Sequence, residues 1–293
     1  MAATDRRGRA RNAIQEVAKS RGLPTDLTIL SERWNPVTLL GDSGVVARAA
    51  TLADLARADP ISAFQQEVAV CRQLASRNAP VQVPVGDVSQ VDWFPISLWQ
   101  QVDGVMGEAT QQAMVESLAQ IHDLGSDITL NQPWFATIAT SIPDDIRRLA
   151  DLSLIDASSA SSLIEYFDRN LGAVETANLS GGLIHGDAQR KNAMAVDNSA
   201  IWIDFEDCCI GPYAWDLACL TMNPNYPVES VLDTYAEASG TDRIPSDVMP
   251  ALWALRDLEA LTWMLLIQEE REPEFQKNAQ HLLREIVSRA NAD

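Results

Sequence analysis

The feature that most constrains this chain is a stretch between residues 183 and 206, where short apolar runs alternate with single acidic or amide side chains. A loop ends at Asp187, Asn192 follows five residues later, and Asp204 closes the apolar run 201–203. Two strands joined by a short turn bring their outer ends together. A β-hairpin between Asn192 and Asp204 therefore places both side chains at one end, and the stretch predicts a β island with a polar edge.

Asp187, Asn192 and Asp204 are the side-chain types that phosphoryl transfer requires. One carboxylate orients the attacking hydroxyl and accepts its proton, while a second carboxylate and an amide oxygen hold the Mg²⁺ that bridges the phosphates. The alternative is that His185-Gly186-Asp187 is only a polar turn between two strands. A His-Gly-Asp triplet followed by four residues and Asn has the spacing of a kinase catalytic loop, which favours the chemical interpretation.

The pattern of apolar residues changes near Asp103, which divides the chain into two expected lobes, 1–102 and 103–293. Strands are expected within 27–50, 81–88 and 93–102, with helices at 8–21 and 61–77. Helices of the second lobe are expected at 110–124, 143–155, 157–178, 228–240, 247–270 and 273–290. This order predicts an α+β fold: a small lobe with an antiparallel sheet plus helix, and a larger, mainly helical lobe. A cleft between such lobes is a common ligand site.

Three sequence stretches resemble the aminoglycoside phosphotransferase and choline kinase group of the protein-kinase-like superfamily. They are LIHGDAQRKN, IWIDFED and GPYAWDLACL, which together span residues 183 to 220. The resemblance implies the bilobal protein-kinase-like fold, ATP or GTP as cosubstrate, and Mg²⁺. It implies Asp187 as the catalytic base, and Asn192 and Asp204 as the metal ligands.

Three further side chains are expected to have structural roles, and two of them, Asp216 and His122, stand at positions that resemble the family. Asp216 matches a family position that resembles a structural anchor, and we expect its buried carboxylate to hold the backbone of the catalytic loop. His185 is expected to fix the loop by hydrogen bonds, with a catalytic histidine as the alternative. His122 also resembles a family feature, and we interpret it as a core histidine with satisfied hydrogen bonds.

The nucleotide site is expected in the first lobe. Arg48 occupies the strand position where kinases usually carry a phosphate-binding lysine, and Glu67 resembles its helix partner. The alternative for Glu67 is a solvated helix residue. Gln101 and Val102 fit the hinge between the lobes, where backbone groups hydrogen-bond a purine edge.

The phosphate-covering loop departs from the family pattern. The family usually has a glycine-containing turn here, whereas Ser31–Pro36 reads SERWNP and has no glycine. Trp34 and Pro36 do not offer the close backbone approach that small residues allow. Either the side chains of Ser31 and Arg33 substitute, or triphosphate binding is weakened. This departure keeps open a catalytically silent nucleotide-binding pseudokinase.

The acceptor is expected to be a small molecule. Gly211-Pro212 follows Asp204 within seven residues, so no room remains for a peptide-docking segment. In the resembling families the C-terminal helices line the acceptor site, and the acidic candidates here are Asp207, Asp257 and Glu259. Arg256 and Glu259 are three residues apart on one expected helix, so they are also expected to pair with each other. Trp253 and Trp263 fit either an aromatic wall for a cationic head group or the helical core.

Charge and composition limit the partners. The net charge is −19, and because residues 1–21 carry six basic and two acidic side chains, the remainder carries −23. Such a chain repels nucleic acid and could attract a cation, although surface acid also serves solubility. No apolar run is long enough for a membrane span, no secretory signal is recognised, and the four cysteines suggest reduced thiols in a cytoplasmic protein.

The sequence therefore predicts a small-molecule kinase that moves the γ-phosphoryl group of a nucleoside triphosphate onto a hydroxyl of an aminoglycoside, choline-like or sugar-like acceptor. The silent pseudokinase module is the second hypothesis. A hydrolase that uses the carboxylates on a metal-bound water is the third, and the sequence favours it least.

Overall fold

The computed structural model describes residues 3–32, 35–52, 55, 59–130 and 134–292. By their contacts these residues form two compact units. Unit 1 contains residues 1–117 and 190–208, and unit 2 contains residues 118–189 and 209–293. The chain therefore returns to the first unit for the segment that carries Asn192 and Asp204. The expected functional division at residues 102 and 103 concerns nucleotide and acceptor binding, and it stays a prediction.

Unit 1 is built on a five-stranded antiparallel sheet with the order β1-β2-β3-β5-β4. Its strands are β1 (Leu27–Ser31), β2 (Val37–Leu40), β3 (Val45–Ala49), β4 (Ser89–Val91) and β5 (Phe94–Gln100). The turn between β2 and β3 contains Gly41 and Gly44, both with positive φ, at 48° and 66°. Glycine adopts this conformation without a Cβ penalty, which explains why a GDSG sequence closes the hairpin.

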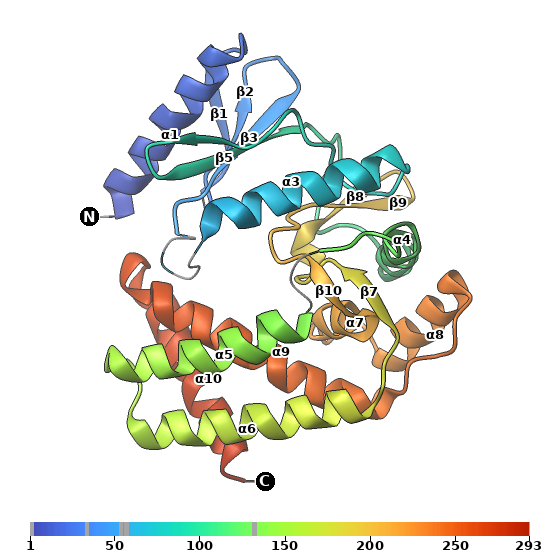
Figure 1. Cartoon of the computed structure of the whole chain (residues 1–293). Coiled ribbons are helices and arrows are strands. Elements are labelled where there is room, and N and C mark those ends of the chain that lie inside the picture. Colours follow the sequence, from blue (N-terminus) through green and yellow to red (C-terminus); the bar gives the residue numbers. More distant parts are fainter. Residues whose placement is uncertain (1–2, 33–34, 53–54, 56–58, 131–133, 293) are drawn as a thin grey trace. The chain divides into compact units, whose positions relative to one another are not determined.

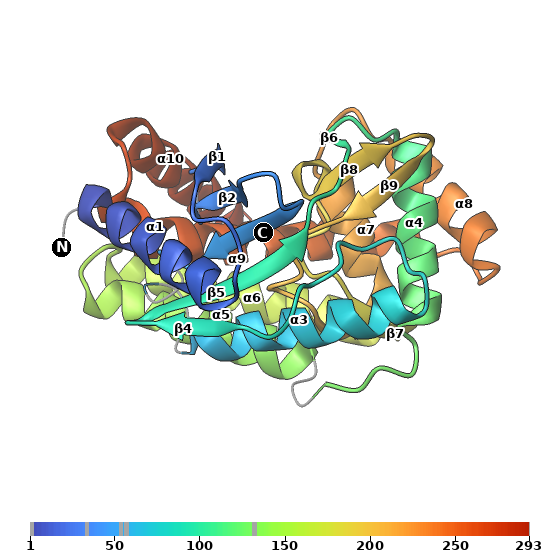
Figure 2. The same cartoon turned by 90° about the horizontal axis from the view of Figure 1, so that it is seen from above.

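Two helices, α1 (Ala3–Ser20) and α3 (Pro60–Ser76), run along this sheet (Figures 1 and 2). One side of β3 packs in a core cluster with the apolar residues of α1, including Ile14 and Val17. Successive side chains of a strand point to opposite faces. Arg48 of β3 therefore points to the other face, where it meets Glu67 of α3.

Unit 1 also contains a second sheet, with the order β6-β8-β9. Its strands are β6 (Val105–Met106), β8 (Ala193–Val196) and β9 (Ser199–Trp202), and the 3₁₀ turn η1 (Arg190–Asn192) precedes β8. Strands β8 and β9 form the hairpin that the sequence predicts between Asn192 and Asp204. Trp202 is fully buried, and its indole N–H donates to the Ser117 hydroxyl at 2.7 Å.

Unit 2 is mainly helical, with one two-stranded antiparallel sheet formed by β7 (Gly181–Ile184) and β10 (Cys209–Pro212). Helix α9 packs against α5, α6, α7 and α10, so it occupies the middle of this unit. The helices of this part are α5 (Trp134–Asp151), α6 (Ala157–Thr176), α7 (Tyr213–Thr221), α8 (Val228–Ser239), α9 (Met249–Ile267) and α10 (Pro273–Ala290), with 3₁₀ turns η2 (Ser246–Val248) and η3 (Gln268–Glu270). Helix α4 (Gln111–Leu124) passes from unit 1 into unit 2.

The predicted α+β class is confirmed, and two expected elements are wrong. Residues 81–88 do not form a strand, because their backbone bonds go to two different strands: Gln82 N–H donates to Trp202, and Val85 N–H donates to Leu98. Pro84, which lacks an N–H, lies between them. The helix expected at 143–155 begins at Trp134, ends at Asp151 and continues through Pro143, although a proline inside a helix removes one backbone hydrogen bond.

Within the described residues, no helix has both the length and the apolar character needed to cross a bilayer.

Candidate active site

The hairpin β8–β9 brings the two expected metal ligands to the same end of one sheet. Ala193 pairs with Trp202, and the N–H of Ile203 donates to the carbonyl of Asn192 at 3.0 Å. Asn192 directly precedes β8 and is buried, and Asp204 follows β9 after a single residue. Asp204 has a φ of 68°, a left-handed conformation that is uncommon for a non-glycine residue. Such residues gather at functional sites, where the surrounding structure holds them.

Arg48 is the centre of a charged cluster in unit 1. Its guanidinium forms ion pairs with Glu67 and Asp204 and lies 3.7 Å from Glu206. It also stacks over the ring of Phe64, 4.5 Å from the centroid. The pair predicted between Arg48 and Glu67 is therefore present.

Glu67 is only 1% exposed, which excludes the solvated-helix alternative. One of its oxygens accepts from the N–H of Phe205 at 2.9 Å. Burial raises the pKa of Glu67 to about 8 against the opposing charge of Arg48, with Asp204 and Glu206 adding to the rise. The helix α3, the strand β3 and the segment after β9 thus share one buried charged centre.

The donor set of unit 1 fits Mg²⁺ only together with a phosphate ligand. Among the residues that the structure describes, no group of three or more His, Cys, Asp or Glu could hold a metal ion by itself. Mg²⁺ in nucleotide sites is bound through one or two protein oxygens, with waters and substrate phosphates completing its shell. One carboxylate from Asp204 and one amide oxygen from Asn192 match that requirement.

In unit 2, the loop after β7 is held by the fully buried carboxylate of Asp216 on α7. Asp216 accepts from the backbone N–H groups of His185 and Gly186, at 2.7 and 2.9 Å, and from Nε2 of His122 at 3.0 Å. Burial alone would raise the pKa of Asp216, but the hydrogen bonds and the nearby histidines outweigh it and lower that pKa. Trp215 completes the attachment, because its indole N–H donates to the carbonyl of Gly186 at 2.8 Å.

His122 is a buried histidine with partners on both ring nitrogens. Its Nδ1 lies 2.8 Å from the Tyr235 hydroxyl, its Nε2 contacts Asp216, and its ring stacks on Tyr213 at a centroid distance of 4.4 Å. The interpretation as a satisfied core histidine is confirmed. The contribution of Tyr235 was missed, since nothing near residue 235 in the sequence indicates a contact 113 positions away.

Asp187 lies at the end of this loop, and its Oδ1 accepts from Nη2 of Arg256 and from Nε2 of Gln189. Nη1 of Arg256 donates to Glu259, so the predicted pair on α9 is confirmed. The sequence did not predict the contact between Arg256 and Asp187, which joins residues 69 positions apart.

The other expected site residues have less distinctive surroundings. Asp257 pairs with Arg289 of α10 at 2.7 Å, and Asp207 is partly buried. The N–H of Gln101 donates to Gly44 at 2.8 Å, and the adjacent Val102 is half-buried. Arg33 and Trp34 lie outside the described residues, so the glycine-poor loop is not tested.

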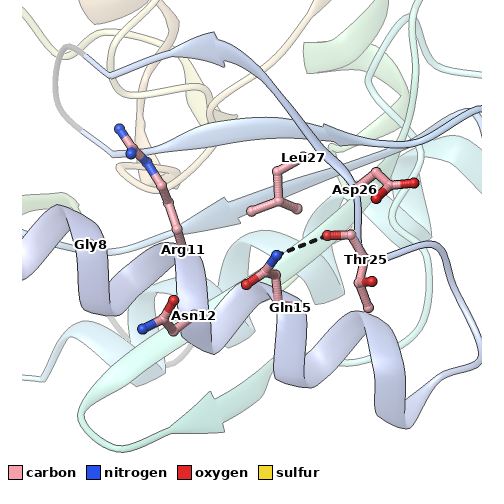
Figure 3. A pocket seen from close by; sticks show the side chains of 7 residues that line it. All are labelled: Gly8, Arg11, Asn12, Gln15, Thr25, Asp26 and Leu27. Carbon is pink, nitrogen blue, oxygen red and sulfur yellow. Dashed lines mark hydrogen bonds between the residues drawn. The ribbon is translucent and has the colours of Figure 1, made fainter.

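A cavity of about 550 Å³ lies elsewhere in unit 1, between α1 and the chain entering β1 (Figure 3). Its lining is formed by Gly8, Arg11, Asn12, Gln15, Thr25, Asp26 and Leu27. Gln15 spans it by donating to the carbonyl of Thr25 at 3.0 Å. None of these seven residues belongs to the predicted site.

Comparison with solved structures finds the same fold. The amicoumacin kinase hAmiN, solved with AMP-PNP, Ca²⁺ and Ami, has a TM-score of 0.72 and 16% identity, over 96% of this chain and 95% of that one. A choline/ethanolamine kinase family protein from Mesorhizobium loti has a TM-score of 0.66 and 16% identity, over 98% and 94%. A thermostable mutant of aminoglycoside phosphotransferase APH(4)-Ia has a TM-score of 0.64 and 17% identity, over 93% and 97%.

No curated protein matches the sequence at a significant level. The model of the phosphotransferase enzyme family, APH, matches residues 33–258, which is more than half of the chain. This span includes the hairpin, the loop held by Asp216 and the first half of α9. The chain belongs to the APH phosphotransferase family and is a small-molecule kinase.

Proposed function

We propose that this protein transfers the γ-phosphoryl group of ATP or GTP to a hydroxyl of a small molecule in an Mg²⁺-dependent reaction. The observation that carries the proposal is the end of the β8–β9 hairpin. There Asp204 and Asn192 flank the same strand pair, and a buried arginine links Asp204 to Glu67. Charge stabilisation and positioning supply most of the catalysis in phosphoryl transfer, and these are the parts that it uses.

The predicted catalytic, metal-binding, nucleotide-binding and loop-supporting residues each have a role in this proposal. Asp187 accepts the proton of the acceptor hydroxyl, which makes the hydroxyl oxygen a stronger nucleophile toward the γ-phosphorus. Arg48, held by Glu67, binds the phosphates, while backbone groups of Gln101 and Val102 hold the base. Bound through Asn192 and Asp204, Mg²⁺ would neutralise phosphate charge. His185 and Asp216 keep the loop in shape.

The similar structures support a nucleotide donor and a small acceptor. One was solved with AMP-PNP and Ami, and another APH(4)-Ia variant was solved with ADP and hygromycin B. Residues 1–102 serve as the nucleotide lobe and 103–293 as the catalytic and acceptor lobe in this proposal. All four cysteines are buried free thiols, which suits the reducing cytoplasm where these nucleotides are abundant.

The test separates the chemical step from binding. Asp187→Asn should keep the affinity for Mg-nucleotide within about threefold and lower kcat by at least about 10³-fold, because only the proton acceptor is lost. Asp204→Asn should instead remove Mg²⁺-dependent nucleotide binding. Calorimetric titration and phosphoryl transfer to a hydroxyl library measure the two effects. Asp233→Asn, an exposed acid of α8, is the matched control and should change neither.

The role assignment fails if Asp187→Asn loses nucleotide binding while Asp204→Asn keeps full activity. The second candidate, a silent nucleotide-binding module, is motivated by the glycine-free Ser31–Pro36 stretch. It predicts Mg-nucleotide binding without turnover for any acceptor, and no change in turnover for Asp187→Asn.

A further inference from the structure

Arg256 is a charged residue of α9 that the proposed reaction has not used. It is 9% exposed, and its guanidinium contacts two carboxylates, those of Asp187 and Glu259. Both contacts lie within unit 2. Since Asp187 is the base in the proposed function, the inference below rests on that proposal.

The geometry of arginine suits a positioning role. The guanidinium is a planar fork with fixed donors, and it holds a carboxylate in one orientation better than a flexible ammonium does. Nη2 binds Oδ1 of Asp187, Nη1 binds Glu259, and Gln189 donates to the same Oδ1. Glu259 therefore holds the arginine while the arginine holds the base. A base that is displaced by about 1 Å loses on the order of 10²-fold in rate.

The same arginine affects which acceptors can approach. The side chain of Asp187 is 13% exposed and has a permanent positive charge in contact with it. A cationic acceptor that approaches Asp187 is repelled by the positive charge of Arg256, so its binding is disfavoured. Glu259 and Asp257, two of the three acids expected to attract a cation, are themselves paired with Arg256 and Arg289.

Aromatic groups flank Arg256 along the same helix. Trp253 and Trp263 are three residues before it and seven after it, so the helical period places all three on one face. Both tryptophans are partly exposed, and the indole N–H of Trp253 donates to Thr221 at 3.1 Å. A helix face that carries a guanidinium, with one indole about one turn before it and another two turns after it, suits a flat or sugar-like hydroxyl compound, with or without an anionic group.

We propose that Arg256 is a positioning residue for Asp187 and that it restricts the acceptor to neutral or anionic hydroxyl compounds. Polycationic acceptors are disfavoured at this site because Arg256 already occupies the carboxylates that would bind them.

The experiment compares wild type, Arg256→Gln, Arg256→Lys and a control, Arg243→Gln. Arg243 also pairs with two carboxylates of unit 2, Glu229 and Asp233, but at an exposed position. Turnover of MgATP is measured with water alone, choline, 3,3-dimethylbutan-1-ol, D-ribose, D-glycerate and hygromycin B. The second and third probes have the same shape and differ in charge.

We expect wild type to use neutral or anionic probes at least about tenfold better than their cationic counterparts, as kcat/KM. Arg256→Gln should lower kcat about 10²-fold with KM for MgATP within twofold, and should reduce the charge preference. Arg256→Lys should recover part of kcat and keep the charge preference, because it keeps the charge but loses the fork. Arg243→Gln should match wild type.

A separate readout follows the base itself. Carbodiimide coupling of glycine ethyl ester, located by peptide mass spectrometry, should increase at Asp187 in folded Arg256→Gln and not in Arg243→Gln. Thermal unfolding shows which variants are folded, and Arg256→Lys replaces Arg256→Gln if the latter is not.

The outcomes separate this inference from the proposed function. Turnover that needs Asp187 but is unchanged in Arg256→Gln, or a wild type that prefers choline or hygromycin B, overturns the inference and leaves the proposed function standing. Turnover with none of the probes, water included, overturns the proposed function and the acceptor class with it. The labelling of Asp187 then still decides whether Arg256 positions it.

Discussion

Arg48 in unit 1 and Arg256 in unit 2 are two nearly buried arginines, each of which donates side-chain hydrogen bonds to two carboxylates. Their side chains are equally exposed, at 10%. The acids around them differ. Glu67 beside Arg48 has a side chain 1% exposed, whereas the side chain of Glu259 beside Arg256 is 28% exposed.

The two clusters therefore differ in how deeply the glutamate beside the arginine is buried. A buried charge that loses its partner is strongly destabilising, because water cannot replace the partner. A partly exposed pair is screened and contributes little. The cluster of unit 1 should therefore hold the fold together, while that of unit 2 should tolerate substitution and affect mainly the reaction.

The largest expected effect is on the buried pair. Glu67→Ala should lower the free energy of unfolding by about 3–5 kcal/mol, because Arg48 then loses its most buried counter-charge. Glu259→Ala, the matched change in unit 2, should cost about 1 kcal/mol or less. Urea denaturation at pH 9, above the pKa of about 8 at which Glu67 ionises, measures both. Equal losses in the two variants would show that burial of the acid does not distinguish the clusters.

Asp216 extends the comparison to a buried acid that is stabilised by N–H donors in place of an arginine. Asp216→Asn should cost about 2–4 kcal/mol at pH 7, because an amide cannot accept from all three donors. The pKa of Asp216 is lowered in the fold from its usual 3.8, so its stabilisation is present above about pH 4 and is lost as the pH falls further.

The stability gap between wild type and Asp216→Asn should therefore shrink below pH 3.8. Urea titrations at a series of pH values measure this gap, with the exposed Asp233→Asn as a control that shows no large gap. A gap that widens on acidification would contradict the sign of the pKa change.

The sequence predicted local features well because these depend on local patterns. The helix expected at 61–77 is α3, at Pro60–Ser76, because its apolar spacing follows the helical period. The hairpin between Asn192 and Asp204 followed from strand, turn and strand signals close together in the chain. The same proximity made Arg256 and Glu259 a predictable pair.

Long-range contacts could not be predicted in this way. The contact of Arg256 with Asp187 depends on how α9 packs in unit 2, and no spacing in the sequence specifies that packing. The contact of Tyr235 with His122 likewise depends on how α8 packs in unit 2, which no spacing in the sequence specifies. Residues 81–88 alternate like a strand, but which neighbours take their backbone bonds is decided by β5 and β9.

A smaller effect tests the fork of Arg48. Arg48→Lys keeps the positive charge but cannot bind Glu67 and Asp204 with two fixed donors, and we expect a loss of about 1–2 kcal/mol. Arg243→Lys, in an exposed cluster of unit 2, should leave the unfolding temperature nearly unchanged. Thermal unfolding with a fitted enthalpy measures both. A lysine tolerated equally at both positions would mean that charge alone, without fork geometry, maintains the cluster of unit 1.

The smallest expected effect concerns Asp145 of α5, a partly exposed acid in unit 2. Burial raises its pKa from 3.8 to about 6, partly opposed by Arg148. A raised pKa in the fold means that the stabilisation is complete below pH 3.8 and is lost as the pH rises through about 6. The side chain at position 145 cannot ionise in Asp145→Asn. This variant should therefore be as stable as wild type at pH 3.8 and more stable than wild type at pH 8. We expect a gain of about 1 kcal/mol or less, discounted for partial exposure.

Asp144→Asn is the matched control, because Asp144 is an exposed neighbour paired with Arg147. It should show no gain at pH 8, because its side chain is exposed to water and paired with Arg147. If Asp145→Asn is instead less stable at pH 8, the charge of Asp145 is favourable in the fold. A counter-charge would then outweigh burial at this partly exposed acid, whereas at Glu67 in unit 1 burial outweighs Arg48 and raises the pKa to about 8.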